Sequence, residues 1–107
     1  MGVRAGNRST HRFTGVWPIV IDGRVFARSW TIEPIGWNQT FRADRLGTIQ
    51  IGDRTVGVRA VPVRSGRLLQ AIEKAYAAKY PTPSSRKYVV GFRAAKRRKT
   101  TVEFLPR

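Results

Sequence analysis

Two β-hairpin signals in succession constrain the fold of this chain more than any other feature of its sequence. An apolar, β-branched run over residues 16–21 ends at Asp22-Gly23, and an alternating segment follows over residues 24–30. Asp-Gly between apolar segments is a strong hairpin signal, because a tight primed turn needs residues that tolerate a positive φ. The pattern recurs around Gly52-Asp53. The sequence therefore predicts a small, mostly β barrel or sandwich built by pairing of neighbouring strands.

Helical periodicity appears after the second hairpin. Ser65 is a suitable N-cap, residues 67–80 place apolar side chains at helical spacing, and Pro81 and Pro83 end the pattern. Residues 37–45 predict a shorter helix and residues 100–105 a last strand. The predicted fold class is α+β, mostly β with one or two helices.

The chain is predicted to form one domain with a basic N-terminal extension. Its 107 residues suffice for a single hydrophobic core. Residues 1–13 are rich in Gly, Arg, Ser and Asn, which is typical of a flexible basic arm. The domain itself is expected over residues 14–107.

Charge leaves two interpretations open. The chain carries 21 Lys and Arg against 6 Asp and Glu, a net charge of +15. Such a surface attracts polyanions, so a non-enzymatic nucleic-acid or polyanion-binding module is one interpretation. An arginine-rich background composition is the other. The residues that would contact phosphates are those of the arm (Arg4, Arg8, Arg12) and of a C-terminal cluster (Arg93, Lys96, Arg97, Arg98, Lys99).

Several classes of chemistry are excluded by residues that the chain lacks. There is no cysteine and one histidine, His11, so thiolate catalysis, disulfides, a catalytic triad and a zinc site are not expected. The six acidic residues are scattered, and no Gly-rich phosphate loop is present. With no secretory signal and no long apolar stretch, a cytoplasmic protein is expected.

Arginine, aromatic and hydroxyl side chains remain as candidates for a site. A guanidinium offers a rigid fork of donors to phosphate, a serine adds a donor, and an indole offers a flat face to a ring. Together such groups predict a pocket for a phosphorylated aromatic cofactor. The alternative is that the strand arginines face solvent and cover the sheet with their stems. The candidates are Arg28, Ser29, Trp30, Trp37, Arg42 and Arg59.

The order and spacing of several segments resemble a known family. These segments are residues 22–30, 37–43, 47–52, 56–63 and 75–80, followed by the tail over residues 100–107. The chain resembles a small, uncharacterised bacterial domain-of-unknown-function family. That family is similar in turn to the FMN-binding split barrels, especially the deazaflavin-dependent nitroreductase type.

The resemblance implies a split β-barrel of antiparallel strands with a helix packed outside, often as a homodimer. It further implies an oxidoreductase that holds FMN or a deazaflavin, with Arg28, Ser29 and Trp30 near the cleft and Trp37 and Arg42 on its rim. One segment departs from the enzymes, which open with a Gly-Arg-Lys/Arg-Ser-Gly-like phosphate loop. Here that segment is missing or reduced to residues 12–15, and a cofactor-free structural barrel would keep the same pattern.

Overall fold

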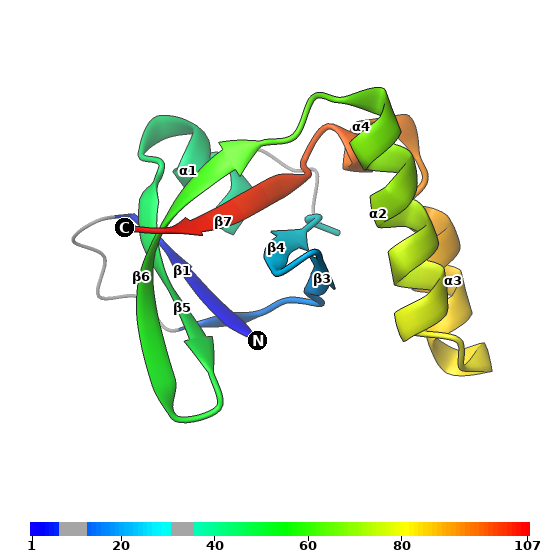
Figure 1. The fold of residues 1–107 in the computed structure, drawn as a ribbon, viewed down its shortest axis with the longest axis horizontal. Coiled ribbons are helices and arrows are strands. Elements are labelled where there is room, and N and C mark those ends of the chain that lie inside the picture. The colour runs from blue at the N-terminus through cyan, green and yellow to red at the C-terminus, as the bar shows by residue number, and fades with distance from the viewer. Residues whose placement is uncertain (7–12, 31–35) are drawn as a thin grey trace.

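A single antiparallel sheet of seven strands curls into a half-barrel in the computed structural model, which describes residues 1–6, 13–30 and 36–107 (Figure 1). The strand order is β2-β1-β5-β6-β7-β4-β3, and every neighbouring pair is antiparallel. The architecture is an α+β split barrel, as the sequence predicted. The strands are β1 (Gly2–Ala5), β2 (Thr14–Gly15), β3 (Ile19–Ile21), β4 (Arg24–Ala27), β5 (Leu46–Ile51), β6 (Arg54–Pro62) and β7 (Val102–Pro106).

Both predicted hairpins form, and the C-terminal strand joins them. Asp22 and Gly23 have φ of 52° and 75°, the conformation that a two-residue primed turn requires, and Gly52 has φ of 61°. Strand β7 pairs with β4 on one side and with β6 on the other. The last strand therefore converts two separate hairpins into one continuous sheet.

Residues 2–5 are part of this sheet, although they lie within the stretch for which a flexible arm was predicted. Strand β1 pairs with both β2 and β5. Val3 is 1% exposed and Ala5 is also buried, so alternate side chains of β1 enter the core. Arg4 accordingly belongs to a strand, whereas Arg8 and Arg12 lie outside the described residues.

Helices occupy two places around the sheet (Figure 1). Helix α1 (Trp37–Ala43) lies by β1, while α2 (Gly66–Lys79) and α3 (Pro83–Gly91) lie side by side, with α2 against β3. The short α4 (Ala95–Arg98) follows α3. The sequence predicted α1 and α2, including the Ser65 cap, whose Oγ accepts from Leu68 N at 3.3 Å. No helix in the described part of the chain has the length and apolar character to cross a membrane.

The hydrophobic residues form two separate cores. One fills the half-barrel beneath α1 and includes Val3, Phe41, Ile49, Val58 and Phe104. The other lies between the β3–β4 hairpin and the α2–α3 pair and includes Ile19, Phe26, Ile72, Tyr76 and Phe92. The segments that run between the two cores are the places where pockets form.

Candidate functional site

A cavity of about 400 Å³ opens beside the end of β4, and half of the residues that line it are aromatic. We call it the aromatic pocket. It brings together four of the six cofactor residues predicted from the sequence, namely Arg28, Ser29, Trp30 and Trp37. The aromatic side chains that line it are Trp17, Trp30, Trp37, Tyr88 and Phe92.

Ring-to-ring contacts hold two of these walls in place. Trp30 meets Tyr88 edge-on at 4.9 Å between ring centroids and meets Phe92 at 5.7 Å. Trp17 meets Tyr88 at 5.4 Å and stacks on Tyr80 at 4.7 Å on its other side. Edge-to-face and stacked pairs of this kind stabilise aromatic clusters beyond their burial. The tryptophans are therefore positioned by neighbours rather than free to rotate.

Trp30 is the most exposed of the five aromatic residues and has a cation beside it. The indole is 40% exposed. The Arg97 guanidinium carbon lies 3.8 Å from the centroid of its ring, and Arg97 Nε donates to the Trp30 carbonyl at 2.9 Å. A Cβ on Gly91 would approach the ring to 2.5 Å, so the absence of a side chain there makes room for the indole. Arg97 thus places a positive charge beside Trp30, although Arg97 itself is not one of the residues that line the aromatic pocket.

Arg28 faces inward and is engaged by the protein. Its side chain is fully buried and uses four of five donors. Burial lowers its pKa, and the Glu73 carboxylate opposes that shift. Its role as a phosphate ligand stays a prediction, one that would require this network to rearrange. The acceptors are Thr101 Oγ1 at 2.7 Å, the Phe92 carbonyl at 2.9 Å, the Leu69 carbonyl at 3.1 Å and Glu73 Oε1 at 3.3 Å.

The backbone around Arg28 is also pinned from both sides. Arg28 N donates to the Tyr76 hydroxyl at 3.0 Å, and that hydroxyl donates to the Trp17 carbonyl at 2.7 Å. Burial raises the pKa of Tyr76, so the hydroxyl stays protonated and able to donate. Ser29 N donates to Thr100 Oγ1 at 2.8 Å. These bonds hold the backbone of Arg28 and Ser29, which line the aromatic pocket, against α2 and against the segment that precedes β7.

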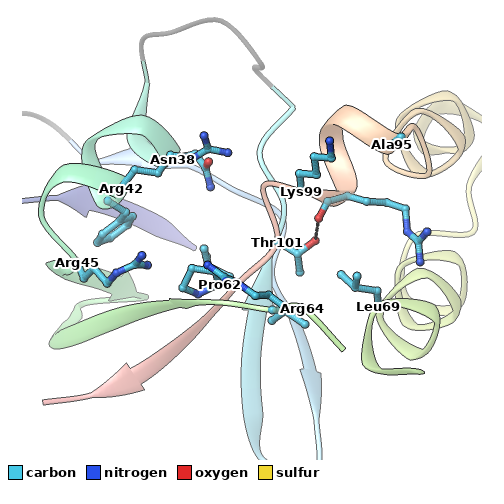
Figure 2. Close-up of a pocket in the computed structure, with 13 residues that line it drawn as sticks. Asn38, Arg42, Arg45, Pro62, Arg64, Leu69, Ala95, Lys99 and Thr101 are labelled. Carbon is cyan, nitrogen blue, oxygen red and sulfur yellow. Dashed lines mark hydrogen bonds between the residues drawn. The ribbon is translucent and has the colours of Figure 1, made fainter. Parts of the chain in front are cut away.

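Arg42 lies elsewhere, in a second and larger cavity of about 730 Å³. Figure 2 shows Arg42 and Arg45 at one side of this cavity and Arg64 and Lys99 toward the other. We call it the cationic pocket, because five lining side chains are basic and none is acidic. Its cations are Arg42, Arg45, Arg64, Arg98 and Lys99. The sequence analysis had singled out Arg42, Arg98 and Lys99, whereas Arg45 and Arg64 were missed.

The remaining predicted residues are divided between the surface and the two pockets. Arg59 is exposed on β6 and lines neither pocket, which matches the interpretation of a solvent-facing strand arginine. Arg93 and Lys96 of the C-terminal cluster are exposed. Nucleic-acid binding by the predicted basic cluster stays a prediction. In the described ranges no group of three or more His, Cys, Asp or Glu side chains could hold a metal ion.

Comparison with known families identifies the family to which the chain belongs. The family model described as "Uncharacterized protein conserved in bacteria (DUF2255)" matches residues 2–104. The chain belongs to this family. The match begins with β1 and ends within β7, so it includes residues of every strand and all residues that line the two pockets. No curated protein and no solved structure matches the chain.

Proposed function

We propose that the aromatic pocket binds a planar, phosphorylated heteroaromatic ligand of the flavin or deazaflavin type, and that the protein is a redox protein. The observation that carries this proposal is the convergence of three tryptophans, Tyr88 and Phe92 on one cavity of about 400 Å³. A volume of this size lies within the range of about 300–1,000 Å³ that is usual for small-molecule and cofactor sites.

The residues present fit the ring of such a ligand. Indole faces exclude water from a planar heterocycle and stack against it. The walls are held by neighbouring rings, so little ordering would accompany binding. Ser29 and Thr14 also line the cavity and are of the hydroxyl type that hydrogen-bonds to ring oxygens and nitrogens.

For the phosphate, the geometry favours Arg97 over Arg28. Arg97 stands over the exposed face of Trp30, and only its Nε hydrogen is donated to a protein carbonyl. The guanidinium therefore keeps donors for an anion at the rim, where phosphate contacts with charged groups are strong. A bound flavin or deazaflavin would supply the hydride chemistry, while the side chains position the ligand and exclude water.

The matched test compares FMN with riboflavin, which has the same ring without the phosphate. We expect saturable binding of FMN or a deazaflavin, followed by the emission of the ligand, with riboflavin bound more weakly. Arg97→Ala should remove most of the difference between FMN and riboflavin, because it removes the phosphate partner. Arg93→Ala is the control, since Arg93 is exposed on the same segment and, in the described part of the chain, makes neither of the contacts that Arg97 makes with the ring and the carbonyl of Trp30.

Absence of binding by FMN and by a deazaflavin would contradict the proposal and leave a cofactor-free barrel. Equal loss in Arg97→Ala and Arg93→Ala would instead assign the effect to the overall charge of the protein.

A second function, binding of single-stranded nucleic acid, is favoured by the exposure of Trp30. A base stacks on an exposed indole, and Arg97, Arg93 and Lys96 provide cations nearby. Affinity for a single-stranded oligonucleotide should then fall with salt, with a slope of about 0.7 per phosphate contact. Binding that does not change with salt would exclude this function.

A further inference from the structure

We propose that the cationic pocket is a second ligand site, independent of the aromatic pocket, and that it takes an oligophosphate, a ligand with two or more linked phosphate groups. Nothing in the function proposed above uses this cavity. Its volume of about 730 Å³ lies within the range typical of small-molecule sites.

The cations of the pocket come from segments that are far apart in the sequence. Arg42 lies on α1 and Arg45 shortly after it. Arg64 follows β6, and Lys99 follows α4. Figure 2 shows the first pair on the α1 side of the cavity and Arg64 and Lys99 beyond Pro62 and Thr101. Like charges gathered by the fold around one cavity repel each other, and an anionic ligand would relieve that repulsion.

Neutralising groups are scarce among the described residues. No described carboxylate lies within ion-pair distance of Arg42, Arg45, Arg64 or Lys99. Arg98 is the exception, because its Nε lies 2.7 Å from Glu73 Oε1. Even this ion pair lacks the geometry of a hydrogen bond, and the buried Arg98 Nε has no hydrogen-bond acceptor in the described ranges. The pocket thus retains most of its positive charge for a ligand.

The arrangement on two sides selects the ligand class. Figure 2 shows cations on two sides of the cavity, and a ligand with linked phosphate groups carries a separate anionic group for each side. The lining also includes apolar side chains, among them Phe41, Pro62 and Val102. Apolar linings with a few placed charges are typical of small-ligand pockets rather than of nucleic-acid tracks, which follow the surface. We therefore assign the site to a small oligophosphate, either free or attached to a nucleoside.

The test titrates the whole chain with orthophosphate, tripolyphosphate and ATP by calorimetry at fixed ionic strength. We expect one tripolyphosphate or ATP per chain, bound at least about tenfold more tightly than orthophosphate, because linked groups bind with a high effective concentration. Comparable affinity for tripolyphosphate and ATP would identify a free oligophosphate as sufficient. Much tighter ATP binding would identify a nucleoside oligophosphate.

Matched variants decide whether the pocket is the site. Arg42→Ala and Arg64→Ala, from opposite sides, should each weaken tripolyphosphate binding about tenfold or more, since each removes charge-assisted contacts. Arg59→Ala is the control, because it removes the same charge from an exposed position of β6 outside the pocket. Trp30→Ala should leave tripolyphosphate binding unchanged, which separates this site from the aromatic pocket.

Three results would overturn the proposal. These are equal affinity for orthophosphate and tripolyphosphate, equal weakening by Arg59→Ala and Arg42→Ala, or no saturable binding. A single-stranded oligonucleotide that competes with tripolyphosphate, and loses as much affinity in Arg59→Ala as in Arg64→Ala, would assign the charge to nucleic-acid binding instead.

Discussion

Replacement of Arg28 by alanine is expected to destabilise the fold, not merely to empty a ligand site. The guanidinium is fully buried and bridges three parts of the chain. Its four hydrogen bonds reach Thr101 before β7, Leu69 and Glu73 on α2, and the Phe92 carbonyl just after α3. Truncation leaves two backbone carbonyls without their donor and opens a cavity where a long side chain lay.

The expected loss follows from the number of acceptors left behind. Removing one partner of a buried, hydrogen-bonded charge costs about 3–5 kcal/mol, because the groups that remain are desolvated and lose a partner. We expect the lower part of this range, since Glu73 keeps its ion pair with Arg98. Domains of this size are stable by about 5–15 kcal/mol in total. Arg28→Ala should therefore lose a large fraction of its stability and lower the melting temperature by more than about 10 °C.

Urea unfolding followed by circular dichroism measures this loss directly. Arg59→Ala is the matched control, because its guanidinium is exposed on β6 and its removal should change stability by no more than about 0.5 kcal/mol. A loss below about 1 kcal/mol in Arg28→Ala would refute the reasoning, since the buried network would then contribute little.

Three further substitutions test other parts of the structure. Gly47→Ala should cost about 1–3 kcal/mol in denaturant unfolding, because its Cβ would lie 2.6 Å from a backbone carbonyl oxygen on the adjacent strand; unchanged stability would contradict this packing. Gly91→Ala should displace the Trp30 indole and shift its emission while the far-ultraviolet circular dichroism stays the same, and an unshifted spectrum would argue against the contact. The Arg24 guanidinium donates to the Glu103 carboxylate at 2.8 and 2.9 Å and lowers its pKa, so this pair stabilises the fold above about pH 4.3 and the contribution is lost as the pH falls through the lowered pKa. Glu103→Gln should therefore reduce stability at neutral pH and flatten its acid dependence, and an unchanged pH profile would refute the assignment.

Local sequence signals accounted for the elements that depend on neighbours in the chain. The Asp22-Gly23 turn, the Gly52 turn and α2 with its Ser65 cap all follow from adjacent residues.

Elements that depend on distant partners were missed. Strand β1 is four residues long and is stabilised by pairing with β5, more than 40 residues away. Helix α3 did carry a local signal, because Thr82 caps it and Pro83 occupies its first turn. That proline had been interpreted only as the end of the preceding helix. A proline four residues beyond the end of one helix can equally begin the next.

The same difference between local and distant contacts applies to the candidate sites. Arg28, Ser29, Trp30 and Trp37 were grouped correctly because they are close in sequence, and they line one pocket. Trp17 and Tyr88 were not assigned to it, since they approach only through packing of α3 on the β3–β4 hairpin. The internal hydrogen bonding of Arg28 was not predicted either, because two of its acceptors are backbone carbonyls of segments that are distant in the sequence.

Binding of FMN to Trp30→Ala, compared with Val90→Ala, tests the central proposal most directly. Val90 is exposed, directly precedes Gly91 in α3 and does not line the aromatic pocket. With FMN emission as the readout, we predict saturable binding by the natural chain and by Val90→Ala, and a loss of about tenfold or more in Trp30→Ala, because stacking on one aromatic face contributes about 1–3 kcal/mol. Equal FMN affinity in the two variants would contradict the aromatic pocket as the ligand site.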